Sequence, residues 1–387
     1  MSFKRADRLD RLPPYLFAEL DRRKKAAIAR GMDLISLGIG DPDLPTPSFI
    51  IDALHEAARD PANHPYPLGA GLPEFRQAVA DWYKRRFGVD LDPANEVVAL
   101  IGSKEGIGHL PIGVLNPGDV ALVPSPGYPV YNAGTVFVGA EPYFLPLREE
   151  NGFRPDLDSI PAEILQRAKL LWINSPNNPT SSVMGKTAFG RIVDFAREND
   201  LLVAHDAAYS EVYFDGKRPP SFLEVPGARD VGVEFHSLSK TFNMTGWRVG
   251  FAVGNRDVLS ALATVKENMD SGLFNAIQHA GIRALSAPDS VTDDIRLVYQ
   301  ERRDFLFPEL KRMGFDFEVP EASFYFWVKV PKGASSLDFC SRLLDEAGVV
   351  VTPGVGFGEA GEGYFRIALT VDIPRMKEAL GRIARLL

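Results

Sequence analysis

The sequence has almost no cysteine. Cys340 is the only one among 387 residues, so no disulfide can form within the chain. Such scarcity is typical of proteins that stay in a reducing compartment. We therefore expect a cytoplasmic protein.

Long apolar runs and an excess of basic residues are also lacking. No run of 18 apolar residues is present, so we predict no transmembrane helix and no membrane partner. The first segment, MSFKRADRLDRLPPYLF, is charged and lacks the apolar core of a signal peptide. With 43 Lys and Arg against 51 Asp and Glu, the formal net charge is −8. A nucleic-acid partner is therefore not expected, because general binding needs a basic surface.

What the chain does contain is an alternation of two patterns. Between residues 96 and 254, short β-branched runs alternate with longer amphipathic runs, which predicts an α/β fold with a mostly parallel sheet between helices. After about residue 290, a long helical pattern leads into a smaller α+β region. We predict a large domain at residues 47–289 and a small domain formed by residues 1–46 and 290–387.

Polar clusters follow the predicted strands of the large domain. They are GSKEG (102–106), SPGYP (125–129), SPNNPTS (175–181), DAAYS (206–210) and SLSK (237–240). Because ligands of such sheets bind beyond the carboxyl ends of the strands, we expect these clusters to line one crevice.

Lys240 is the residue that gives this crevice a chemistry. It lies between apolar, strand-like segments, and a lysine is rarely buried without a partner or a role. A buried lysine with a lowered pKa is suited to forming a Schiff base with a carbonyl compound. A carboxylate at a neighbouring strand end could pair with a pyridine nitrogen, and serines, an arginine and a helix N-terminus could hold a phosphate. Together these groups describe a site for pyridoxal 5′-phosphate.

Five segments, in this order along the chain, give the sequence a specific likeness. YPLGAGLPEFR, NSPNNPTS, HDAAYSEV, SLSKTFNMTGWRVG and YFRIALT resemble the motifs of class I aminotransferases, which are fold-type-I pyridoxal-phosphate enzymes. The likeness covers nearly the whole chain. It implies an amino-group transfer between an amino acid and a 2-oxo acid, and a homodimer with sites shared between the subunits.

The resemblance also implies a role for individual residues. Lys240 would bond to the cofactor and move the proton, Asp206 would face the pyridine nitrogen, and Tyr209 would contact the phenolic oxygen. The remaining cofactor contacts it implies are Tyr66 from the other subunit, Ser103, Lys104, Tyr128, Asn178, Ser237, Ser239 and Arg248. Arg366 would bind the substrate α-carboxylate with help from the backbone near Gly40. The motif more often has glycine where Ser181 stands, which puts the geometry of that turn in question.

The segments LPPYLFAEL, LGIGDPDLPTP, GSKEGIGHL and LFNAIQ most resemble LL-diaminopimelate aminotransferases. That likeness implies oxoglutarate as the acceptor. The substrate contacts it implies are Tyr15, Gly40, Asn178, Asn275 and Arg366. In KENMDSGLFN, Asp270 would suit a distal ammonium group, whereas Lys104 could instead hold a distal carboxylate. An aspartate or broad-specificity aminotransferase therefore stays an alternative.

Other interpretations also stay open. Taken singly, Lys240 could be a solvated loop residue, Asp206 a turn former, Arg366 the outward residue of a strand, and His205 a satisfied core histidine. A carbon–sulfur lyase or an aminocyclopropane-type synthase of the same fold would use the same residues. A transcriptional regulator is disfavoured, because it would need a basic DNA-binding domain ahead of the aminotransferase-like sequence.

Two further expectations concern ions and the backbone. The histidines show no metal-like spacing, and no metal site is predicted. The peptide bonds Ser175–Pro176 and Asn178–Pro179 are predicted to be cis, because this loop must turn Asn178 toward the cofactor.

Overall fold

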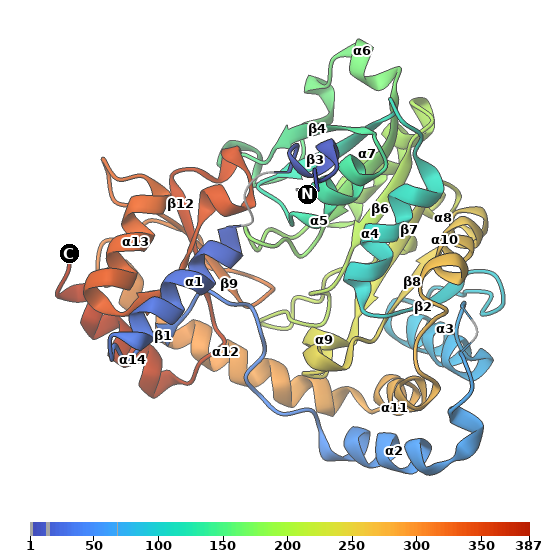
Figure 1. Ribbon diagram of the computed structural model, residues 1–387, viewed down its shortest axis with the longest axis horizontal. Coiled ribbons are helices and arrows are strands. Elements are labelled where there is room, and N and C mark those ends of the chain that lie inside the picture. The colour runs from blue at the N-terminus through green and yellow to red at the C-terminus, as the bar shows by residue number, and fades with distance from the viewer. Residues whose placement is uncertain (1–2, 13–15, 68) are drawn as a thin grey trace.

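A seven-stranded sheet forms the centre of the larger body of the protein (Figure 1). The computed structural model describes residues 3–12, 16–67 and 69–387, with the side chains of residues 16–20 excepted. The strand order is β2-β8-β7-β6-β5-β3-β4, and only β8 runs antiparallel to its neighbours. The strands are β2 (Val97–Leu100), β3 (Val120–Ser125), β4 (Glu141–Pro146), β5 (Ala168–Asn174), β6 (Leu202–Asp206), β7 (Gly232–Ser237) and β8 (Gly250–Gly254). The predicted α/β fold with a mostly parallel sheet is confirmed.

Helices cover both faces of this sheet, because its strands are apolar on both sides. One face packs against α4 (Ser103–Val114), α5 (Val130–Phe137) and α10 (Arg256–Met269). The other packs against α3 (Pro73–Phe87), α7 (Lys186–Glu198) and α11 (Asn275–Leu285), and α2 (Ser48–Arg59) packs on α11. Short helices α6 (Ala162–Leu165), α8 (Ala228–Val231) and α9 (Leu238–Thr241) complete this body.

The alternation of side chains along β6 sends two polar residues to opposite faces of the sheet. His205 contacts Phe189 of α7 on one face, whereas the Asp206 carboxylate accepts a hydrogen bond from Tyr131 of α5 on the other. Both side chains are buried. Their separation across the sheet matters for the electrostatics of the site.

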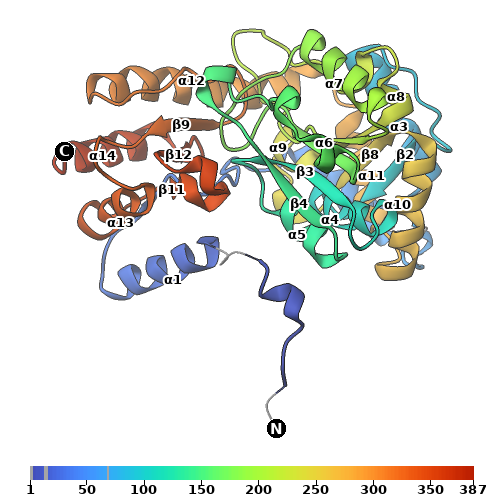
Figure 2. The same ribbon diagram turned by 90° about the horizontal axis from the view of Figure 1, so that it is seen from above.

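A second body lies beside the first and has its own core (Figures 1 and 2). It contains the antiparallel sheet β11-β12-β9 and the parallel pair β1-β10. Its strands are β1 (Ile35–Ser36), β9 (Tyr325–Lys329), β10 (Val349–Val350), β11 (Thr352–Pro353) and β12 (Tyr364–Ala368). Its helices are α1 (Leu16–Ala29), α12 (Asp289–Arg312), α13 (Ser336–Ala347) and α14 (Ile373–Ala384). Figure 1 shows α12 running from beneath β9 toward α11 of the larger body.

One segment that follows a strand of the larger body packs into the core of the second. Tyr209, Val212 and Phe214, which follow β6, pack into the core of the second body. The boundaries at residues 46/47 and 289/290 stay a prediction.

Two backbone findings bear on the sequence expectations. Ser175–Pro176 and Asn178–Pro179 are cis, as predicted, and Ser125–Pro126 is cis as well. In the described parts of the chain, no helix is long and apolar enough to cross a membrane.

Candidate active site

Lys240 lies in α9, directly after β7, at the carboxyl end of the central sheet. Burial lowers the pKa of its amine to about 8, and the nearby Arg248 and Arg366 guanidinium groups act in the same direction. Asp41 and Asp206 oppose this shift. A lysine with this pKa is partly unprotonated near neutral pH, so its nitrogen can attack a carbonyl carbon.

Asp206, at the end of β6, is a buried acid whose hydrogen-bond partners are uncharged. Its Oδ2 accepts a hydrogen bond from the Tyr131 hydroxyl at 2.8 Å, and its Oδ1 accepts one from the Ala208 N–H at 3.3 Å. Burial raises its pKa, and among the described residues no cation lies within salt-bridge distance of it. A protonated pyridine nitrogen would supply the missing positive charge. The residue therefore fits the predicted cofactor.

The N-terminus of α4 and one arginine form a cradle for an anion. Gly102 has φ 73° and precedes Ser103, the first residue of this 12-residue helix. A Cβ atom on Gly102 would collide with the guanidinium of Arg248, so the helix N-terminus and the arginine lie side by side. Backbone N–H groups and a guanidinium together suit a phosphate.

The other residues predicted to hold the phosphate differ in burial. Ser237 and Ser239 are buried at the start of α9, where the Ser237 hydroxyl accepts a hydrogen bond from the Ser239 N–H at 3.2 Å. Lys104 is exposed on α4. Tyr128 is half-buried before α5, with its ring edge-on to Tyr131 at 5.9 Å between centroids.

Arg366 of β12 brings the second body into the site. Its Nη1 donates to the Asn178 Oδ1 at 2.6 Å, and its Nη2 donates to the Gly38 carbonyl at 2.8 Å. The guanidinium carbon lies 4.0 Å from the centroid of the Tyr325 ring and 4.7 Å from that of Phe357. These rings fix its plane, and its buried Nε has no hydrogen-bond partner. An unpaired buried donor on a fixed guanidinium suits a substrate carboxylate.

Gly40 lies close to the backbone that contacts Arg366. The help that the backbone near Gly40 gives Arg366 with the substrate carboxylate stays a prediction, and the Gly38 carbonyl, two residues earlier, accepts from the guanidinium. A Cβ atom on Gly40 would lie 2.6 Å from the Tyr325 Cζ and would overlap its hydroxyl. The glycine thus leaves room for Tyr325, whose hydroxyl lies 2.8 Å from that of Tyr209.

Ser181 stands in the turn where the motif more often has glycine. It adopts a left-handed conformation with φ 61°, as glycine would. Its hydroxyl donates to the Tyr325 carbonyl at 2.8 Å and lies 2.7 Å from the Ser323 hydroxyl, which accepts from the Tyr325 N–H. The turn geometry is retained, and a buried hydrogen-bond ring holds it.

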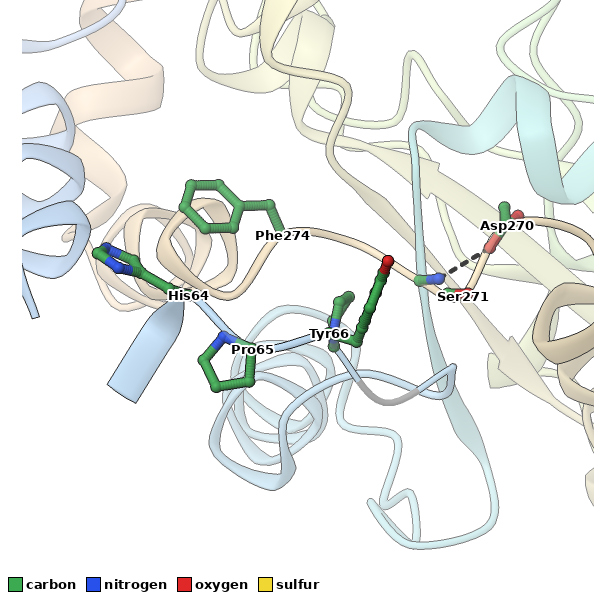
Figure 3. Close-up of a pocket in the computed structure, with 8 residues that line it drawn as sticks. His64, Pro65, Tyr66, Asp270, Ser271 and Phe274 are labelled. Carbon is green, nitrogen blue, oxygen red and sulfur yellow. Dashed lines mark hydrogen bonds between the residues drawn. The ribbon is translucent and has the colours of Figure 1, made fainter. Parts of the chain in front are cut away.

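A cavity of about 500 Å³ opens beside Tyr66 (Figure 3). It is also lined by Asp270 and Phe274, and the Tyr66 side chain is 92% exposed. Asn275 begins α11 and is buried. Within one chain, Tyr66 therefore does not join the residues around Lys240. Tyr15 lies outside the described residues.

Asp270 belongs to a charged cluster with Glu105, His109 and Lys266. The fully buried Lys266 ammonium donates to Glu105 at 2.9 Å and to Asp270 at 3.3 Å. Ligand atoms of the two acids and His109 lie within 4.8 Å of one another. The Lys266 ammonium already pairs with both acids. It partly neutralises the Asp270 carboxylate, which was predicted to bind the distal ammonium of the substrate.

Sequence reasoning did not assign Tyr325 or Tyr131. Both are buried aromatic residues in apolar patterns, where nothing local marks a tyrosine as different from a core residue. The Tyr325 hydroxyl contacts that of Tyr209, and the Tyr131 hydroxyl donates to Asp206. Both partners lie far away in the sequence.

Comparisons with known proteins agree with this geometry. Residues 32–383 match the family described as aminotransferase class I and II. A curated LL-diaminopimelate aminotransferase of Syntrophobacter fumaroxidans is 58% identical and covers 100% of both chains, and one of Aquifex aeolicus is 55% identical over 99% of both. A substrate-bound BacF structure from Bacillus subtilis superposes with a TM-score of 0.96 at 39% identity, covering 100% of this chain and 98% of the other. The chain therefore belongs to the class I and II aminotransferases, a family of pyridoxal-phosphate enzymes that act on amino acids and 2-oxo acids.

Proposed function

We propose that this aminotransferase binds pyridoxal 5′-phosphate at Lys240 and transfers an amino group from LL-diaminopimelate to oxoglutarate. The observation that carries the proposal is the convergence of a lysine with pKa about 8, a buried carboxylate without a cation and a stacked arginine with an unpaired N–H. The full-length similarity to enzymes named for this substrate supports the choice of donor.

Each site residue has a separate role in this proposal. When bound, the cofactor supplies an electron sink. Lys240 would hold it covalently until the substrate amine takes its place, and the released Lys240 amine would carry a proton to and from the substrate α-carbon. Asp206 would keep a negative charge for the pyridine nitrogen, and Tyr209 would contact the phenolic oxygen. Arg366 orients the α-carboxylate through its free N–H. The phosphate would be held by Ser103, Lys104, Ser237, Ser239 and Arg248, with Tyr128 against the ring and Asn178 beside Arg366.

We base the choice of amino donor on the charge of the substrate's distal group. Glu105 and Asp270 share one ammonium, that of Lys266, so with both acids ionised and His109, which lies 2.8 Å from Glu105, uncharged, the cluster keeps one net negative charge. A distal ammonium would be attracted to it and a distal carboxylate repelled. Burial raises the pKa of Glu105 despite Lys266, and this preference should therefore strengthen as the pH rises through the titration of that acid.

A donor comparison on one preparation tests this proposal. With oxoglutarate as acceptor, LL-diaminopimelate should give a larger kcat/KM than aspartate, because an unpaired buried charge costs several kcal/mol. The reverse order would move the assignment to an aspartate or broad-specificity aminotransferase. Formation of glutamate without release of ammonia would separate transamination from the carbon–sulfur lyase alternative.

We also propose a cytoplasmic homodimer in which Tyr66 and Asn275 contribute to the partner's site. An aromatic side chain that is 92% exposed beside a cavity of about 500 Å³ supports this. Mixing inactive Tyr66→Phe and Arg366→Lys variants should regenerate activity, because each hybrid dimer contains one intact site. If subunits exchange and no activity returns, sharing of the site is wrong.

A further inference from the structure

A buried carboxylate, Glu234 of β7, organises a polar network beneath the site. It is fully buried and accepts hydrogen bonds from side chains of several elements. The Tyr83 hydroxyl donates to its Oε1 at 2.6 Å, and the His236 Nε2 contacts the same oxygen at 2.7 Å. The Ser221 hydroxyl and the Phe222 N–H donate to it at 3.0 Å and 2.8 Å. So many donors around one carboxylate stabilise its ionised form.

His205 is the remaining partner, and both of its ring nitrogens face acceptors. Its Nδ1 lies 2.8 Å from the Glu234 Oε2, and its Nε2 lies 3.0 Å from the Ser175 carbonyl oxygen. A carbonyl cannot donate, and an ionised carboxylate cannot either. A neutral imidazole has one N–H, so one of these two short contacts would then join two lone pairs. Only the doubly protonated ring satisfies both.

His236 differs in this respect. Its Nε2 donates to Glu234, but its Nδ1 lies 3.5 Å from the Ser210 hydroxyl, which can donate to it. The neutral ring therefore satisfies its surroundings. Two histidines on one carboxylate thus have different protonation states, and the difference follows from the second partner of each.

The surroundings of Glu234 favour its ionised form. Burial alone would raise the pKa of Glu234, but His205 and His236 bring it well below its usual range. Burial and Glu234 raise the pKa of Tyr83, so that its hydroxyl keeps its proton and donates. Charged groups nearby include Arg86 and Glu211, which pair with each other at 3.1 Å, and Glu224, which accepts from the Ser221 N–H at 2.9 Å.

We propose that Glu234 holds His205 as a buried imidazolium, and that this cation, next to Asp206 in β6, keeps the Asp206 carboxylate ionised and ready for a cationic ligand. His205 is thus a positioning residue. It acts from the opposite face of the sheet and touches neither cofactor nor substrate. The consequence for pyridoxal 5′-phosphate rests on the proposed function, whereas the protonation of His205 does not.

The size of the effect follows from the spacing of adjacent residues on opposite faces. A cation on the order of 8 Å from Asp206, at an effective dielectric constant of about 20, changes the ionisation equilibrium of Asp206 by at most roughly 30-fold, because the paired Glu234 carboxylate opposes it. Loss of the cation should weaken binding of a ligand that needs ionised Asp206 by a similar factor. A purely structural network would not act selectively on Asp206.

Three variants separate the two explanations. His205→Gln removes the cation, Glu234→Gln removes the charge that holds it, and His236→Gln is the matched control, because His236 is neutral in this assignment. The infrared C=O stretch of a protonated carboxyl, assigned by Asp206→Asn, should grow in His205→Gln and not in the control, and it should grow less in Glu234→Gln, because that variant loses an anion together with the cation. The dissociation constant of pyridoxal 5′-phosphate should rise by up to roughly 30-fold in His205→Gln and by less in Glu234→Gln, relative to the control. An equal change in all three variants would overturn the positioning role.

The protonation state itself is measured on the wild-type, cofactor-free full chain. Nitrogen-15 spectra of histidine-labelled protein, with the His205 signals assigned by His205→Gln, should show both ring nitrogens of His205 protonated. A neutral tautomer would overturn the proposal even if every variant failed to fold. Because this measurement needs no cofactor, failure to bind pyridoxal 5′-phosphate would contradict the proposed function and leave the inference about His205 standing.

Discussion

Replacing Ser181 by glycine, the residue more usual in this turn, should destabilise the protein. The serine is buried in a left-handed conformation, so glycine would relieve backbone strain. It would also break the ring in which the Tyr325 N–H donates to Ser323, Ser323 to Ser181, and Ser181 to the Tyr325 carbonyl. The sign of the change depends on which effect is larger.

The magnitudes favour the hydrogen bonds. A left-handed conformation costs a residue with a Cβ atom roughly 1–2 kcal/mol. Two buried hydrogen bonds together contribute about 2 kcal/mol, and glycine costs a further 0.5–1 kcal/mol, roughly, through the entropy of the unfolded chain. We expect Ser181→Gly to lower the free energy of unfolding by about 1 kcal/mol. Ser181→Ala keeps the strain and loses the same bonds, so it should cost about 2–3 kcal/mol.

Urea unfolding at one fixed protein concentration measures the order of stability. Wild type should exceed Ser181→Gly, and Ser181→Gly should exceed Ser181→Ala. Ser323→Ala should resemble Ser181→Ala, and the double variant should cost clearly less than the two single changes together, because they share one hydrogen bond. A glycine variant more stable than wild type would refute the reasoning, as would strict additivity of Ser181→Ala and Ser323→Ala.

Three further predictions concern the site directly. In the cofactor-free protein, reductive trapping of pyridoxal 5′-phosphate by borohydride should increase with a midpoint near pH 8, because the neutral amine of Lys240 is the reactive form; a midpoint near that of free lysine would contradict the burial argument. Tyr325→Phe keeps the ring against Arg366 but removes the hydroxyl that contacts Tyr209, so kcat/KM should fall about 5-fold for the loss of one hydrogen bond. Gly40→Ala should lower kcat/KM at least about 10-fold, because its Cβ overlaps the Tyr325 hydroxyl, and adding Tyr325→Phe should restore part of it; an additive double variant would show that the overlap is not the cause.

The central sheet could be predicted from the sequence because its signals are local. Runs such as those of β3 and β5 are largely apolar, and each is followed by a polar cluster at its carboxyl end. The two cis peptide bonds were also predicted. Asp206 and Lys240 could be proposed together because strand ends meet at one edge of a parallel sheet.

Contacts between distant segments could not be predicted in this way. The carbonyl of Gly38 accepts from Arg366, 328 residues away, and this contact depends on how the first segment passes β12. The Lys266 ammonium, whose pairing with Asp270 four residues later is local, also donates to Glu105 of α4, 161 residues away in the sequence. The partner of a charge depends on packing that no local pattern records.

The sequence by itself determined the fold class, the family likeness and the lysine, aspartate and arginine on which the proposed chemistry rests. These follow from periodicity and from residue types at strand ends, which are properties of short segments. The tertiary structure decided how those residues are tuned: Tyr325 beside Arg366, Tyr131 on Asp206, and Glu234 with His205 beneath the sheet. Hydrogen bonds and burial set protonation states, and both depend on which distant side chains meet in the folded chain.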